Sequence, residues 1–147
     1  MDRNLSGPRR GRGTRGQALT EFALVVPLLL LMVVGVMEFG RAWAQSQVVT
    51  DAARQGARIA SILNGSSAGQ DSVRRVVKRA LVAGNITATD QMIAIDDGWK
   101  AGTNTPVGVT VSVPYDFGVL RPVMQLAAQS FNDGTITLRS SAVMRNE

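Results

Sequence analysis

The sequence predicts an α+β protein: a long N-terminal transmembrane helix that continues outside the membrane, a second helix, and a small antiparallel sheet of about three strands. Two patterns carry this prediction. Residues 22–37 contain no charged side chain, and residues 107–115, VGVTVSVPY, alternate valine with small or polar residues. A long uncharged apolar run is typical of a membrane helix, and strict alternation is typical of a strand with one buried face.

The apolar run is short for a membrane span. As a helix, residues 22–37 cover about 24 Å, whereas the hydrocarbon core of a bilayer is about 30 Å thick. Beginning the span at Ala18 supplies the missing length but brings Thr20 and Glu21 to the membrane edge. A charged side chain inside the bilayer costs about 2.5–3.5 kcal/mol and is a candidate functional residue. Glu21 therefore needs a positive partner, and the sequence offers no fixed cation one helical turn later.

Pro27 lies inside the apolar run. It removes one backbone hydrogen bond from the helix, which membrane helices tolerate better than soluble ones do. Pro27 either causes a kink without functional importance or makes the helix locally more flexible, which lets packed subunits or partner helices bend.

The first 16 residues, MDRNLSGPRRGRGTRG, carry five arginines against one aspartate, so they hold +4 of the net charge of +5. Their glycine, proline and serine content predicts disorder. A nucleic-acid-binding arm has the same composition, but arginines directly ahead of an apolar run are typical of the cytoplasmic flank of a membrane helix. We therefore expect a cytoplasmic leader (1–16), a transmembrane helix (17–38) and an extracytoplasmic domain (39–147), with the lipid bilayer and not nucleic acid as a partner.

The composition excludes several classes of site. The chain contains no cysteine and no histidine, which excludes a disulfide framework, the usual zinc sites and catalysis by cysteine or histidine. It has no phosphate-binding loop. Asp90 and Asp116 show no partner in the sequence, and the adjacent Asp96 and Asp97 are expected to form a turn. We expect no catalytic, cofactor-binding or metal-binding residue and no enzymatic activity.

Residues 39–63 continue the helix with one broad face of apolar or small residues. These residues are Trp43, Val48, Val49, Ala52, Ala53, Gly56, Ala57, Ile59, Ala60 and Leu63. The small ones allow another element to approach closely, either the protein's own domain or a helix of an assembly partner. Asp51, Arg54 and Arg58 on the opposite side predict one surface ion pair. Trp43 suits a membrane–water interface.

Residues 70–84 predict a second helix that ends at Gly84. An apolar stripe lies opposite a basic face, which is either solvated or in contact with lipid headgroups or an acidic partner. The basic face consists of Arg74, Arg75, Lys78 and Arg79. Residues 92–96, 107–115 and 135–145 predict three strands, and a short helix is expected to begin near Pro122.

Gly16, followed by four residues and then by Glu21, Phe22 and an apolar run, resembles the processing motif of type IV pilins and pseudopilins. The longer string from Gly16 to about Leu63, with its segments EFALVVPLLLL, EFGR and DAARQGAR, resembles the TadE-like family, the pseudopilins of the tight-adherence (Flp) pilus system. The C-terminal TLRSSAVMRNE is a looser match. The predicted layout of helices and strands agrees with that of pilin-like proteins.

The resemblance implies that a prepilin peptidase cuts after Gly16 on the cytoplasmic side, so that Gln17 becomes the first residue. The new α-amino group would then lie four residues from Glu21 and pair with it on the same chain or on a neighbour. The processing residues would be Gly16, Gln17, Glu21 and Phe22, and the assembly residues Glu21 and Pro27. Many type IV pilins begin with phenylalanine, so Gln17 departs from the pattern that N-methylation follows.

By the same resemblance, the chain is expected to be a pseudopilin or minor pilin of the bacterial inner membrane. Its partners would be the prepilin peptidase, other pilins or pseudopilins, and inner-membrane pilus assembly proteins. Two alternatives stay open: an uncut single-pass scaffold of the same apparatus, and a secreted protein cut by signal peptidase after Ala44, where Ala42, Trp43 and Ala44 form an A-x-A site.

Overall fold

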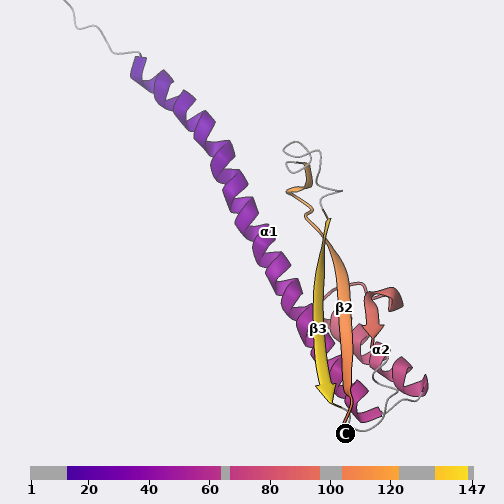
Figure 1. The fold of residues 1–147 in the computed structure, drawn as a ribbon. Helices are drawn as coiled ribbons and strands as arrows, with labels where there is room; N and C mark the ends of the chain where they lie inside the picture. The colour runs from indigo at the N-terminus through magenta and orange to yellow at the C-terminus, as the bar shows by residue number, and fades with distance from the viewer. Residues whose placement is uncertain (1–12, 64–66, 97–103, 123–134, 146–147) are drawn as a thin grey trace, which may run out of the picture. The chain divides into compact units, whose positions relative to one another are not determined.

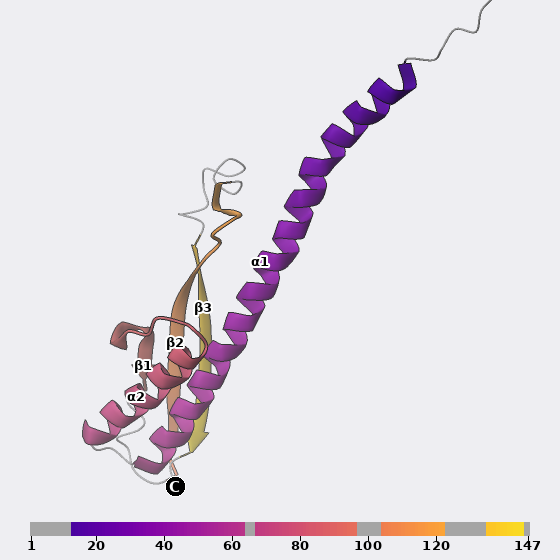
Figure 2. The same ribbon diagram turned by 180° about the vertical axis from the view of Figure 1, so that it is seen from behind.

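The computed structural model describes residues 13–63, 67–96, 104–122 and 135–145, and side chains from residue 16 onward (Figures 1 and 2). Its elements are α1 (Gly13–Leu63), α2 (Ser67–Ala83), the short 3-10 helix η1 (Asp90–Met92), β1 (Ile93–Ile95), β2 (Pro106–Asp116) and β3 (Thr135–Arg145). The predicted α+β class is confirmed. The predicted disorder of the leader before residue 13 and most of the helix expected near Pro122 lie outside the described residues.

The chain divides into two compact units, Met1–Val36 and Met37–Glu147, each of which is described by itself. In the first unit, the described side chains of α1 are almost all exposed, and Pro27 lies inside the helix. Among the described residues, α1 is the one helix long and apolar enough to cross a membrane. The exposed apolar surface of residues 19–36 is what lipid would cover in a membrane-anchored protein.

In the second unit, the remainder of α1 and the whole of α2 cover one face of the sheet (Figure 2). On α1, the residues that face the core are small, and four alanines are fully buried: Ala52, Ala53, Ala57 and Ala60. α2 contributes Val73, Val77 and Leu81, each with no exposed surface. The small-residue face of α1 therefore packs under the protein's own domain, one of the two interpretations that the sequence left open.

The sheet has the order β1-β2-β3, with both pairs antiparallel. Its central strand β2 places Val111 opposite Ile93 of β1 and Ser140 of β3. The alternation read from the sequence is confirmed, since the four valines of β2 point into the core: Val107, Val109, Val111 and Val113. The other face is more polar, and the Thr110 hydroxyl donates to Ser141 Oγ there at 3.1 Å.

The end of α2 lies within one residue of the predicted stop at Gly84. The helix ends at Ala83, and the residue with a left-handed backbone is Asn85 (φ 60°), not Gly84. The Ile86 N–H donates to the Leu81 carbonyl at 3.0 Å and the Asn85 N–H to the Val82 carbonyl at 2.9 Å, which is the Schellman pattern. Gly84 is needed for space, because a Cβ there would collide with the side chain of Val48.

Trp43 and Leu63 are corrections to the predicted buried face of residues 39–63. The Trp43 side chain is 61% exposed, and Leu63 is also exposed. Successive residues of a helix are turned by about 100° from each other, so Trp43 points away from the face that its neighbour Ala42 buries. The predicted ion pair is confirmed, with Arg54 Nη1 3.7 Å from Asp51 Oδ1.

Gly56 stands where α1 meets both α2 and the sheet. A Cβ built there would lie 2.6 Å from Val77 Cγ2 and 3.0 Å from Val109 Cγ1. Both neighbours are β-branched side chains with no exposed surface, so neither has room to turn aside. The close approach of the three elements therefore requires glycine at this position.

We expect Gly56→Ala to lower the free energy of unfolding, because overpacking a core costs about 1–3 kcal/mol, more than the gain of about 1 kcal/mol in helix propensity. The control is Gly40→Ala on the same helix, where nothing lies within 4 Å of the added Cβ and only the gain applies. Denaturant unfolding of the full chain in detergent, followed by circular dichroism, measures both. Equal or greater stability of Gly56→Ala than of Gly40→Ala would contradict the packing argument.

Candidate functional site

The first candidate site lies at the N-terminal end of α1, and all of its residues are exposed. Gln17 Nε2 donates to Glu21 Oε1 at 3.1 Å, and the Thr20 hydroxyl donates to the Gly16 carbonyl at 2.9 Å. In the uncut chain, the side-chain amide of Gln17 is therefore one turn from the Glu21 carboxylate and bonded to it. The structure brings together two of the four predicted processing residues, Gln17 and Glu21.

The other predicted residues of this end lie on the same helix. Gly16 has nothing within 4 Å of the place where a Cβ would be, and the Phe22 side chain is exposed. Pro27 follows further along α1. The peptide bond after Gly16 lies within α1, and the Gly16 carbonyl accepts the hydrogen bond from Thr20.

A second site, centred on Glu38, was not predicted. Glu38 directly follows the apolar run, yet it is only 1% exposed. The Tyr115 hydroxyl donates to its Oε2 at 3.0 Å, the Val119 N–H donates to its Oε1 at 3.1 Å, and Arg41 Nη1 lies 3.4 Å from Oε1. A buried carboxylate is tolerated only when donors or cations satisfy it, and this one has three partners.

Each partner of Glu38 has a local reason for its position. Tyr115 is the last buried residue in the alternation of β2, so its ring points to the same side as the core valines. Beyond β2 the chain turns, because the Arg121 N–H donates to the Phe117 carbonyl at 2.9 Å and Arg121 Nη1 lies 3.6 Å from Asp116 Oδ2. That turn directs the Val119 N–H toward α1.

The Tyr115 hydroxyl has a perturbed pKa. Burial raises the pKa of this phenol above 10.0, and the hydrogen bond to Glu38 and the carboxylate's negative charge raise it further. The Tyr115 ring also meets that of Phe117 edge-on, with centroids 5.1 Å apart. The phenol thus stays protonated as the donor that Glu38 requires.

The sequence contained two signals for this site. Glu38, Ala42 and Val49 share one helical stripe, and a charged residue on a buried stripe calls for a partner. Tyr115 is the single tyrosine of the chain, at an inward position of a strongly alternating strand. Neither signal indicates that these two residues meet, because they are 77 positions apart.

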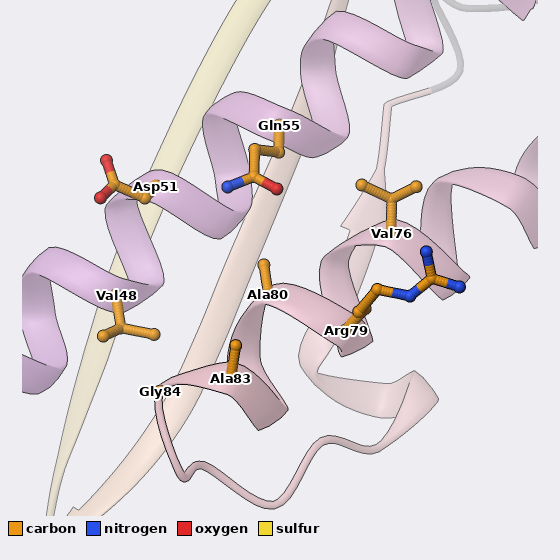
Figure 3. Close-up of a pocket in the computed structure, with 8 residues that line it drawn as sticks. All are labelled: Val48, Asp51, Gln55, Val76, Arg79, Ala80, Ala83 and Gly84. Carbon is orange, nitrogen blue, oxygen red and sulfur yellow. The ribbon is translucent and has the colours of Figure 1, made fainter.

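A groove of about 490 Å³ lies between α1 and α2 (Figure 3). Val48 and Gln55 of α1 face Ala80 and Ala83 of α2 across it. Polar groups at the groove come from Asp51, Gln55 and Arg79. It holds no nucleophile with a neighbouring base. Among the described residues, no three His, Cys, Asp or Glu side chains lie close enough together to hold a metal ion.

Asp90 and Asp116 have cationic partners, contrary to the prediction. Lys78 Nζ lies 2.7 Å and Arg74 Nη1 3.9 Å from Asp90 Oδ1, and Asp116 pairs with Arg121 as described above. The hydrogen bond from Lys78 is the main reason that the pKa of Asp90 is below its usual value, although partial burial opposes it. Half of the predicted basic face of α2 therefore anchors the segment that leads into β1.

Residues 65–69, GSSAG, match the letters of the G-x-S-x-G pattern of hydrolases. In those enzymes the serine sits on a strand-to-helix turn and is activated by histidine. Here the element before it is the helix α1 and Ser67 begins α2, while the chain contains no histidine. The match carries no catalytic argument.

A model of the TadE-like protein family matches residues 16–58. Over these residues the chain is similar to TadE-like proteins. The match begins at Gly16 and confirms the resemblance to the TadE-like family. Searches of curated proteins and of solved structures found no match.

The TadE-like segment, residues 16–58, contains both ends of the apolar run: Glu21 before it and Glu38 after it. It also contains most of the small-residue face that packs on the sheet. Tyr115 and Val119, which bind Glu38, lie outside the segment. Glu38 of the TadE-like segment therefore accepts hydrogen bonds from two residues outside that segment, Tyr115 and Val119.

Because Tyr115 is the single tyrosine, absorbance of the full chain in detergent titrates that phenol alone. We expect a midpoint above 10.0, and a lower midpoint in Glu38→Gln, which removes the charge but keeps an acceptor. A raised folded-state pKa contributes stability that is complete below pH 10.0 and lost as the pH rises through the folded-state midpoint.

The control for this titration is Asp71→Asn, an exposed acid on α2 that should leave the midpoint unchanged. An identical midpoint for wild type and Glu38→Gln would show that the carboxylate does not act on the phenol. A titration midpoint of wild-type Tyr115 equal to that of free tyrosine would show that the contact with Glu38 does not form.

Proposed function

We propose that this chain is a single-pass pseudopilin or minor pilin of a tight-adherence pilus assembly system, matured by a prepilin peptidase that cuts after Gly16. The observation that carries the proposal is the bonded pair Gln17–Glu21, placed directly after Gly16 and directly before an exposed apolar helical segment within the TadE-like match.

The basic leader supports a location in the bacterial inner membrane with the N-terminus in the cytoplasm. Arginines ahead of a span are typically retained on the cytoplasmic side, and the domain after Met37 would then lie outside the cytoplasm. The peptidase would act on the cytoplasmic side. The other partners proposed are pilins or pseudopilins and inner-membrane assembly proteins, with the lipid bilayer around α1.

The chemistry of maturation explains why an acid precedes the span. Water adds across the Gly16–Gln17 peptide bond, which leaves a carboxylate on Gly16 and a new ammonium group on Gln17. The side chain of Gln17 already reaches Glu21 at 3.1 Å, so the ammonium on the same residue arises within one turn of the carboxylate. It offsets the cost of holding Glu21 beside lipid. A neighbouring chain could supply the ammonium in an assembly.

The chain is proposed to be the substrate of an enzyme and not an enzyme itself. The runner-up is an uncut scaffold of the same apparatus, in which Gln17 remains the partner of Glu21. Cleavage by signal peptidase after Ala44 would separate Glu38 from the domain and leave the Tyr115 hydroxyl and the Val119 N–H without their acceptor. The structure favours retention of that segment.

Maturation is tested by the intact mass of the protein from membranes of cells that contain the peptidase. We expect wild type to begin at Gln17 and Gly16→Ala to keep its leader. The control Gly35→Ala makes the same change on the same helix, with nothing within 4 Å, and should be cut normally. A wild-type chain that begins at Met1 would contradict maturation and support the uncut scaffold. One that begins at Gln45 would show cleavage by signal peptidase.

The assembly role of Glu21 is tested by counting pili on cells that express Glu21→Ala. We expect this variant to be cut after Gly16 but to reduce the number of pili at least tenfold, because the ammonium of Gln17 then has no carboxylate to bind. The control Asp71→Ala removes an exposed acid of α2 and should assemble like wild type. A normal number of pili on cells that express Glu21→Ala would show that assembly does not require the Glu21 carboxylate.

A further inference from the structure

Two aromatic side chains stand exposed directly after the apolar run. Phe39 is 68% and Trp43 61% exposed, although both are large and apolar. They lie one turn apart on α1, with ring centroids 6.4 Å apart and the rings stacked. Within the described residues, neither ring contributes to the core of the domain.

The same face of α1 becomes polar beyond Trp43. Continuing at helical spacing, it carries Gln47, Thr50 and Arg54. On this face the exposed apolar surface that begins in the apolar run therefore continues past residue 37 to Trp43. Residues 22–43 span about 33 Å as a helix, close to the roughly 30 Å of a bilayer core. Extension in this direction supplies the length that the apolar run lacked without drawing Glu21 into the membrane.

The domain places one more apolar side chain at this level. Val119 is 57% exposed, and its N–H is held by the Glu38 carboxylate at 3.1 Å. Because Glu38 precedes Phe39 on α1, this bond holds the Val119 backbone at the level of the first turn after the apolar run, on the side of α1 that Glu38 faces. The charges nearby are compensated, since Arg41 pairs with Glu38 and Arg121 with Asp116.

We propose that Phe39, Trp43 and Val119 form a membrane-contact surface that lies in the headgroup region of the outer leaflet. Aromatic rings with a polar edge favour that zone, and the surface continues the apolar segment of the same helix. The extracytoplasmic boundary of the span then lies at Trp43, and the turn after β2 rests on the bilayer. This inference rests on the proposed membrane anchoring and deepens it.

The test is fluorescence quenching in vesicles of phosphatidylcholine and phosphatidylglycerol that contain lipids brominated near the headgroup end of their acyl chains. The full chain is reconstituted with Trp99→Phe, which leaves Trp43 as the single tryptophan. We expect the brominated lipids to quench Trp43 at least twofold more strongly than iodide present on both sides of the bilayer.

Two further single-tryptophan chains locate the surface, both built on Trp43→Phe with Trp99→Phe. Val119→Trp changes an exposed side chain and should be quenched by the brominated lipids, as Trp43 is. Arg54→Trp lies on the same face of α1 as Trp43 but three turns further along and should be quenched by iodide. The Arg54 chain is the matched control for a tryptophan on this helix outside the membrane.

Stronger quenching by iodide at Trp43 or at Val119→Trp would overturn the inference. So would protection from both quenchers that weakens as the protein is diluted with lipid, since a second copy would then cover the surface. Carbonate extraction of the same vesicles separates the two proposals. A chain that resists extraction but shows a water-exposed Trp43 rejects only the contact surface, whereas a chain that is extracted rejects the membrane anchoring as well.

Discussion

The buried carboxylate of Glu38 is the constraint on which the arrangement of the domain depends. A charge removed from water must keep its hydrogen-bond donors. Its donors are the Tyr115 hydroxyl at the end of β2 and the Val119 N–H in the turn that follows. The rotation of α1 about its axis, the end of the central strand and the turn are therefore fixed together by one side chain.

Close packing along α1 complements this polar contact. Alanines and Gly56 bring the helix near the sheet, and buried valines of β2 and α2 pack against them. Such an interface tolerates little rotation or sliding, because β-branched side chains have few alternative rotamers. Glu38 at one end of the interface between α1 and the sheet and the small residues along that interface specify the same position of α1.

Local patterns predicted the helices and strands because each has its own period. The alternation of residues 107–115 and the small face of residues 39–63 required no knowledge of tertiary contacts. The pairing of Glu38 with Tyr115 could not be predicted, since no local rule connects positions 77 residues apart. The end of α2 at Gly84 was predicted to within one residue, but the need of Val48 for glycine there and the left-handed conformation of Asn85 depend on tertiary packing and could not be predicted.

The separation of Glu38 from its donors has a consequence during synthesis. Ribosomes add about 5–20 residues per second, so the 77 residues between Glu38 and Tyr115 take roughly 4–15 seconds to translate. Throughout that interval the carboxylate has only water and Arg41 to solvate it. A hydrated charge at the end of a nascent apolar helix resists being drawn into lipid. Until Tyr115 and Val119 have been made, the Glu38 carboxylate therefore cannot be buried without losing its hydrogen bonds.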